Sequence, residues 1–131
     1  MTPEAADYLE KAQTDLADAR KVAGIGLARV AARLAYYAAF HAAEALLVQR
    51  LGKVGKTHSG VRAQFASLLK DEPDAGRAML AFLARAYAYK QSGDYAVGRD
   101  ASITPIQAEK AVEGAEQFVE RIAAMIGSST E

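Results

Sequence analysis

The sequence predicts an all-α, up-and-down helical bundle of four main helices and one short helix, formed by a single domain over residues 1–131. The chief observation is a run at residues 29–52 that contains no proline and no internal glycine and is rich in alanine and leucine. Elsewhere apolar residues recur every three or four positions, and no segment alternates with the two-residue period of a strand. A chain of 131 residues can bury a core without disulfides.

The first helix is predicted to begin at the N-terminus of the chain. Thr2 is a good N-cap, and Pro3 suits the first helical position because its ring already has a helical backbone angle. Gly24 and Gly26 are expected to end this helix. Its apolar face comprises Tyr8, Ala12, Leu16, Ala19 and Ala23.

The run at residues 29–52 is predicted to be the central helix. Most of its circumference is apolar, which is typical of a helix that neighbours bury on several sides. With about 100° per residue, one strip of this helix comprises Arg33, Tyr37, His41 and Glu44. Because unpaired buried charge is costly, these polar groups must either pair with one another and with another helix or face a cleft.

The third and fourth helices follow a glycine-containing turn at residues 52–56. Residues 57–59 can cap a short helix whose inward face comprises Val61, Phe65, Leu68 and Leu69. A polar break at residues 71–74 precedes the fourth helix, whose apolar stripe comprises Met79, Leu80, Leu83, Ala86 and Tyr87. Lys90 lies at the inner end of this stripe, where its ammonium either reaches solvent or meets an acid.

The C-terminal part is predicted to be a loop followed by the last helix. Residues 91–102 lose the helical period and carry two glycines, so we interpret them as a loop. Thr104 and Gln107 then form a capping-box pattern around Pro105. The stripe of the last helix comprises Ala108, Val112, Ala115, Phe118, Val119, Ile122 and Ile126. Residues 127–131 are expected to be a frayed tail.

The composition excludes several classes of function. Sixteen basic and sixteen acidic residues cancel, which argues against broad non-specific DNA binding. The absence of cysteine excludes disulfides, cysteine-ligated zinc and a thiol nucleophile. We find neither a signal-peptide pattern nor an apolar run long enough for a membrane span, so we expect a cytoplasmic protein with no membrane partner.

His41 and Glu44 lie within one helical turn of each other. Bundles use glutamate and histidine at this spacing to bind metals, but one such element supplies too few ligands, and no second one occurs. We therefore expect no metal site and no cofactor. The pair either forms a buried hydrogen bond that sets helix register or contributes to a cleft.

Lys56, His58 and Ser59 lie at the start of the predicted short helix. Exposed amides at a helix N-terminus, together with a lysine, could hold a phosphate. The alternative is that this segment only caps the helix, since lysine, threonine and glycine are ordinary turn residues.

Lys90, Asp94 and Tyr95 place a base, an acid and an aromatic ring together after the fourth apolar stripe. Residues of mixed chemistry next to a buried face are good candidates for a functional site. The alternative is a Lys90–Asp94 ion pair that closes the end of the helix.

Three segments carry a resemblance to a known family. They are residues 35–47 (AYYAAFHAAEALL), residues 56–61 (KTHSGV) and the pattern Ala-Tyr-x2-Lys-x3-Asp-Tyr at residues 86–95. Together, and in this order, they resemble short bacterial and archaeal HEPN-domain proteins that carry Arg/Lys-x3-Asp-Tyr in place of Arg-x4-6-His. The likeness extends over residues 8–126.

This resemblance implies a HEPN helical bundle, commonly a homodimer with a groove between the protomers. It also implies a link to nucleotide or RNA binding, often beside a nucleotidyltransferase-like partner in toxin–antitoxin pairs. HEPN ribonucleases carry an arginine and a histidine where this chain has Lys90 and Asp94. Because an aspartate is mostly ionised at pH 7, it is a poor general acid, and we do not expect the usual ribonuclease route.

We therefore favour a non-catalytic or weakly catalytic nucleotide- or RNA-binding module. Its site is predicted to comprise Arg33, Tyr37, His41, Glu44, Lys56, His58, Ser59, Lys90, Asp94 and Tyr95. One alternative is a divergent, metal-independent ribonuclease toxin in which His41 or His58 is the general base. A second alternative is a purely structural, homodimeric interaction protein whose polar strip sets register and dimer specificity.

Overall fold

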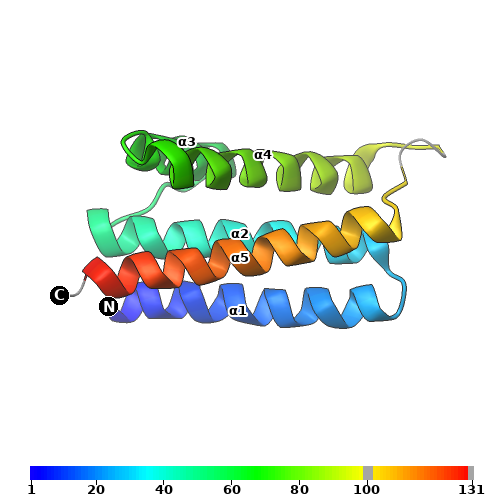
Figure 1. The fold of residues 1–131 in the computed structure, drawn as a ribbon, viewed down its shortest axis with the longest axis horizontal. Coiled ribbons are helices and arrows are strands. Elements are labelled where there is room, and N and C mark those ends of the chain that lie inside the picture. The colour runs from blue at the N-terminus through cyan, green and yellow to red at the C-terminus, as the bar shows by residue number, and fades with distance from the viewer. Residues whose placement is uncertain (99–101, 130–131) are drawn as a thin grey trace.

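A computed structural model describes residues 1–98 and 102–129 of the chain, and this part contains five α-helices and no strand. They are α1 (Pro3–Gly24), α2 (Ala28–Leu51), α3 (His58–Leu69), α4 (Pro73–Tyr95) and α5 (Pro105–Ser129) (Figure 1). The predicted all-α bundle of four long helices and one short helix is confirmed. No helix in the described ranges has both the length and the apolar character of a membrane span.

The helix α2 lies at the centre of the molecule and packs against each of the other four helices. Helices α1 and α5 run alongside it on one side, and α3 and α4 cover the other (Figure 1). Its large core residues Tyr36, Leu46 and Leu47 are fully buried. Buried alanines fill much of the remaining surface of α2, and their small side chains let the neighbouring helices approach closely. The prediction of a central helix buried on several sides is confirmed.

Side-chain caps start three helices where the sequence predicts them. Oγ1 of Thr2 accepts a hydrogen bond of 3.1 Å from a backbone N–H in the first turn of α1. Oγ1 of Thr57 accepts one of 3.0 Å at the start of α3. Before α5, the N–H of Gln107 donates to Oγ1 of Thr104 at 3.1 Å, and the N–H of Thr104 donates to Oε1 of Gln107 at 2.9 Å. These bonds satisfy amides that have no partner within the helix.

The prediction of a loop over residues 91–102 is wrong for its first five residues. Helix α4 continues through them and ends at Tyr95, where the N–H of Ala96 donates to the carbonyl of Ser92. Residues 99–101 of the predicted loop lie outside the described residues.

Two contacts with α2 explain why α4 is longer than predicted. A Cβ atom on Gly93 would lie 2.8 Å from Cγ of Arg29, so this glycine allows a close approach of two helices and does not mark a break. The next residue, Asp94, binds Lys90 within α4 and Arg33 on α2, which anchors the last turn. Neither contact can be read from the local sequence of α4.

The prediction of a frayed tail is also wrong for residues 127–129, because α5 continues to Ser129. Ile126 is fully buried, and this contact holds the final turns of α5 against the core. Residues 130–131 of the predicted tail lie outside the described residues.

Gly114 on α5 makes room for the ring of Phe82 on α4. A Cβ atom on Gly114 would lie 2.3 Å from Cε1 of Phe82. We therefore expect Gly114→Ala to displace this ring and to lower the free energy of unfolding by about 1 kcal/mol, since overpacking typically costs more than the gain in helix propensity. Urea unfolding followed by circular dichroism measures the effect.

Gly127→Ala is the matched control, because it lies on the same helix and a Cβ atom there would have no neighbour within 4 Å. This variant should be as stable as the wild type or slightly more stable. A Gly114→Ala protein as stable as Gly127→Ala would contradict the proposed close approach.

Candidate functional site

Two cations from distant parts of the sequence meet on one carboxylate. Nε of Arg33 on α2 donates to Oδ1 of Asp94 at 3.1 Å, and Nζ of Lys90 on α4 lies 2.9 Å from Oδ2 of the same residue. The exposed fractions of the Lys90 and Asp94 side chains are 13% and 17%, whereas that of Arg33 is 36%. These contacts with Asp94 therefore hold the ammonium of Lys90 and the Nε side of the Arg33 guanidinium in fixed positions at the surface.

The neighbouring charges stabilise the ionised form of both Lys90 and Asp94. Burial alone would raise the pKa of Asp94, but the hydrogen bonds and charges of Lys90 and Arg33 outweigh it and lower this pKa. The hydrogen bond to Asp94 raises the pKa of Lys90 despite the effect of burial. At neutral pH this cluster therefore carries two positive charges and one negative charge, and Asp94 cannot act as a general acid.

Two tyrosine rings lie close to the ammonium of Lys90. Nζ is 6.0 Å from the ring centre of Tyr37 and 5.6 Å from that of Tyr95. The side chain of Tyr95 is 72% exposed. The cluster thus places aromatic surface next to fixed cations, the two features with which proteins bind bases and phosphates.

A second group of residues surrounds His58, which lies at the start of α3. Its ring stacks on Phe40 with the ring centres 4.1 Å apart and the planes at 12°. Nδ1 of His58 is 3.3 Å from Oη of Tyr36, and this oxygen accepts a hydrogen bond of 3.1 Å from Nη1 of Arg62. The guanidinium of Arg62 lies 3.9 Å from the ring centre of Tyr87. These contacts hold one edge of an otherwise exposed imidazole.

Tyr37 connects the two groups. Its ring meets His58 edge-on at 6.0 Å and stacks on His41 at 6.2 Å, in addition to its contact with Lys90. The structure therefore brings residues from α2, α3 and α4 to one place on the surface. Among the predicted site residues, this cluster contains Arg33, Tyr37, His58, Lys90, Asp94 and Tyr95, with His41 at its edge.

His41 is held between two carboxylates on the side of α2 that faces α1. Nδ1 of His41 is 2.6 Å from Oε1 of Glu44, and Nε2 is 3.7 Å from Oδ2 of Asp15. Burial raises the pKa of Asp15 despite the opposite effect of His41. Both imidazole nitrogens thus face α1 or α2 carboxylates, which favours the interpretation that His41 and Glu44 set helix register. Within residues 1–98 and 102–129, no group of three potential metal ligands occurs.

The structure does not bring Lys56 and Ser59 into the cluster. Both are exposed, and Oγ of Ser59 is 3.5 Å from Oγ1 of Thr57, which caps α3. In the described part of the chain, Lys56 has no hydrogen bond or ion pair. The geometry here favours the capping alternative.

Arg62 and Tyr36 belong to the same cluster as His58 but were not predicted from the sequence as site residues. Arg62 follows His58 by four positions, which places both on the same face of α3. That spacing was available in the sequence, but the partner that holds both residues is the hydroxyl of Tyr36 on another helix. Gln91 supports the same network, because Nε2 donates to Oη of Tyr87 at 2.7 Å.

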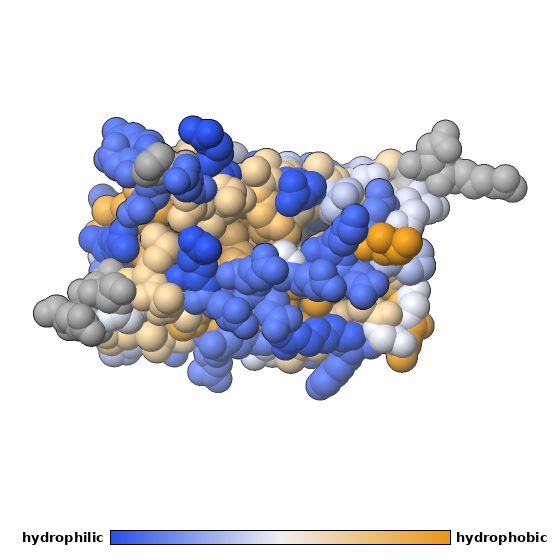
Figure 2. Space-filling view, viewed as in Figure 1, coloured by the Kyte–Doolittle hydropathy of each residue, from blue (hydrophilic) through white to orange (hydrophobic). Residues whose placement is uncertain are grey.

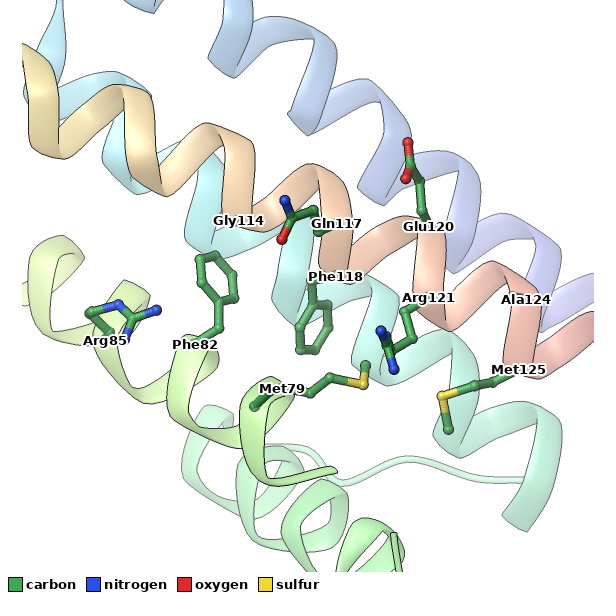
Figure 3. Close-up of a pocket in the computed structure, with 11 residues that line it drawn as sticks. Met79, Phe82, Arg85, Gly114, Gln117, Phe118, Glu120, Arg121, Ala124 and Met125 are labelled. Carbon is green, nitrogen blue, oxygen red and sulfur yellow. The ribbon is translucent and has the colours of Figure 1, made fainter. Parts of the chain in front are cut away.

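A hollow of about 780 Å³ lies elsewhere, between α4 and α5. Met79, Phe82 and Phe118 point into it, with Arg85 on one wall and Arg121 on the other (Figure 3). Figure 2 shows that apolar surface between these helices is interrupted by strongly hydrophilic side chains. None of the predicted site residues lines this hollow. We place the candidate site at the cluster instead, because that is where fixed cations and shifted pKa values coincide.

Comparison with known proteins gives one family. Residues 5–125 match the model of the HEPN domain, which covers nearly the whole chain. None of the curated proteins compared with the chain matches it in sequence.

Proposed function

Because the chain belongs to the HEPN domain family, we propose that it is a nucleotide- or RNA-binding module that does not turn over its ligand. The family is often associated with nucleotide- or RNA-related functions, and this chain has the means to bind such ligands on the surface formed by α2, α3 and α4. We further propose that the module works as a homodimer in a toxin–antitoxin pair with a nucleotidyltransferase-like protein.

One observation carries the proposal: Asp94 fixes Arg33 and Lys90 side by side, next to the rings of Tyr37 and Tyr95. A fixed guanidinium and a fixed ammonium can bind phosphate oxygens with little further loss of side-chain entropy. An exposed tyrosine can stack on a base of any identity. This combination favours a ligand that contains both a phosphate and a base.

The state of Asp94 supports binding without turnover. Its two carboxylate oxygens each bind a cation, and its pKa is lowered, so it holds no proton to donate at neutral pH. His41 is held by Glu44 and faces Asp15. Of His41 and His58, only His58 therefore remains a candidate to replace the catalytic histidine that HEPN ribonucleases carry and this chain lacks.

We expect the wild-type protein to bind a fluorescent short single-stranded RNA or a fluorescent ADP in an anisotropy titration at 50 mM salt. If two or three phosphates contact the protein, affinity for the RNA should fall about tenfold between 50 and 200 mM monovalent salt. No binding of either probe at low salt would count against the proposal and would favour the purely structural interaction protein.

A divergent, metal-independent ribonuclease is the second candidate. Burial and the nearby charge of Arg62 lower the pKa of His58, so its imidazole is neutral at pH 7, as a general base requires. The RNA from the binding experiment can be recovered and analysed on a denaturing gel. Intact RNA after prolonged incubation would reject this candidate, whereas cleavage that His58→Ala abolishes would favour it.

A further inference from the structure

The hydroxyl of Tyr36 is fully buried and has two partners in the described residues. Nη1 of Arg62 lies 3.1 Å from it and Nδ1 of His58 lies 3.3 Å from it. A buried hydroxyl hydrogen without an acceptor is costly, so its direction can be determined by counting donors and acceptors. Neither the proposed function nor the family match assigns a role to this residue.

Only one arrangement of hydrogen-bond donors and acceptors gives each of these groups a partner. A guanidinium can only donate, so the oxygen of Tyr36 is the acceptor in its contact with Arg62. The hydroxyl hydrogen must then be donated to the second partner, which is Nδ1 of His58. A nitrogen that accepts a hydrogen bond carries no proton, and a neutral imidazole has its proton on the other nitrogen. His58 is therefore protonated at Nε2.

We propose that Tyr36 is a positioning residue that holds neutral His58 in the Nε2–H form, so that the imidazole offers its ligand a hydrogen-bond donor. In the part of the chain that the structure describes, Nε2 of His58 has no hydrogen-bond partner. Together with Lys90 and Arg33, it would donate to the oxygens of a phosphate. The ligand part of this inference rests on the proposed function, whereas the protonation pattern does not.

The surroundings of His58 oppose the alternative, protonated form. An imidazolium would carry a hydrogen on Nδ1 as well, and the hydroxyl hydrogen of Tyr36 would lose its acceptor. Stacking on Phe40 keeps the ring from turning away. The charged groups that act on His58 come from all three packed helices: Arg62 on α3 and Lys90 on α4 oppose protonation, as does His41 on α2 when it is charged, while Glu44 on α2 favours it. Burial and these charges together lower the pKa of His58.

This arrangement has a consequence for catalysis. A general base needs an unprotonated nitrogen that faces the ligand, but the unprotonated nitrogen of His58 faces Tyr36. His58 can thus donate a hydrogen bond to a phosphate at neutral pH without being charged, but it cannot take a proton through Nε2. This orientation of His58 disfavours the ribonuclease candidate.

Long-range proton–nitrogen NMR spectra of the ¹⁵N-labelled full chain at pH 7.5 test the inference directly. Such spectra distinguish a protonated from an unprotonated ring nitrogen. We expect the wild-type protein to show His58 protonated at Nε2. The ratio of this form to the other neutral form should fall about fivefold when the hydroxyl of Tyr36 is removed, as the loss of one hydrogen bond predicts. A wild-type spectrum with the proton on Nδ1 would overturn the inference without any variant.

Tyr36→Phe removes only the hydroxyl and should return His58 to a mixture of both neutral forms, with a pKa closer to the usual histidine value. Tyr37→Phe is the matched control, because it removes the neighbouring hydroxyl while the ring stays edge-on to His58. We expect no change in the His58 signals of this variant. If the ratio of the two neutral forms of His58 were the same in Tyr36→Phe as in the wild type, the inference would also be contradicted.

The two proposals fail in different ways. Failure to bind RNA or ADP, with His58 still protonated at Nε2, would overturn the proposed function and leave the positioning role intact. Binding of RNA by a protein whose His58 is protonated at Nδ1 would do the reverse.

Discussion

Lys90→Ala is expected to weaken binding of the short RNA or of ADP by about 10- to 100-fold, since a hydrogen bond to a charged group contributes about 1.5–3 kcal/mol. Two effects act together. The ligand loses the ammonium that lies near Tyr37 and Tyr95, and Asp94 loses one of its two cations, so its negative charge repels the phosphate more strongly. Anisotropy titrations at fixed salt measure the change.

Lys110→Ala is the matched control, because Lys110 is an exposed lysine on α5 and its loss changes the net charge equally. It should alter affinity by less than about twofold at moderate salt, where distant charges are screened. Lys90→Arg, which keeps the positive charge, should retain most of the binding. Equal losses in Lys90→Ala and Lys110→Ala would mean that net charge alone drives binding.

Asp94→Asn is expected to lower the free energy of unfolding by about 2 kcal/mol at pH 7. Removing one partner of a buried ion pair costs about 3–5 kcal/mol, and we reduce this value because Arg33 remains partly solvated and asparagine keeps one acceptor oxygen. The loss should fall on the last turn of α4, which Asp94 ties to α2. Urea unfolding gives the total effect, and hydrogen exchange shows whether this turn is the part affected.

The effect of Asp94→Asn should depend on pH in a defined direction. Because the pKa of Asp94 is lower in the folded than in the unfolded protein, its contribution is complete above about pH 4 and is lost as the pH falls through the folded value. The stabilities of the wild type and the variant should therefore converge in acid. Asp71→Asn is the control, since Asp71 is exposed. A difference that is the same at pH 3 and pH 7 would contradict the role of the charge.

Much of the fold follows from neighbouring residues in the sequence. The helix starts at Thr2, Thr57 and Thr104 depend on a hydroxyl and on an amide three positions later, so the pattern alone predicts them. The end of α4 depends instead on Arg29 and Arg33, which belong to another helix. A local pattern reads Gly93 as a break because it contains no information about α2.

Local sequence patterns likewise predict one part of the candidate site and miss another part. Helical spacing on α2 places Arg33 and Tyr37 on one strip, and spacing on α4 places Lys90 and Asp94 one turn apart. The sequence cannot show that Asp94 binds cations from both helices. It also cannot show that Tyr36, which is an apolar core residue by pattern, holds His58 through its hydroxyl.

The sequence by itself determined the number and type of helices, the caps that start three of them and the central place of α2, because these depend on local propensity and on how much of each helix is apolar. The tertiary structure alone decided which polar groups meet, and so left Lys56 and Ser59 outside the cluster that contains Lys90 and His58 and brought Arg62 into it. The physical reason is that a hydrogen bond or ion pair needs its two atoms within about 3 Å, and only the packing of α3 and α4 on α2 sets those distances.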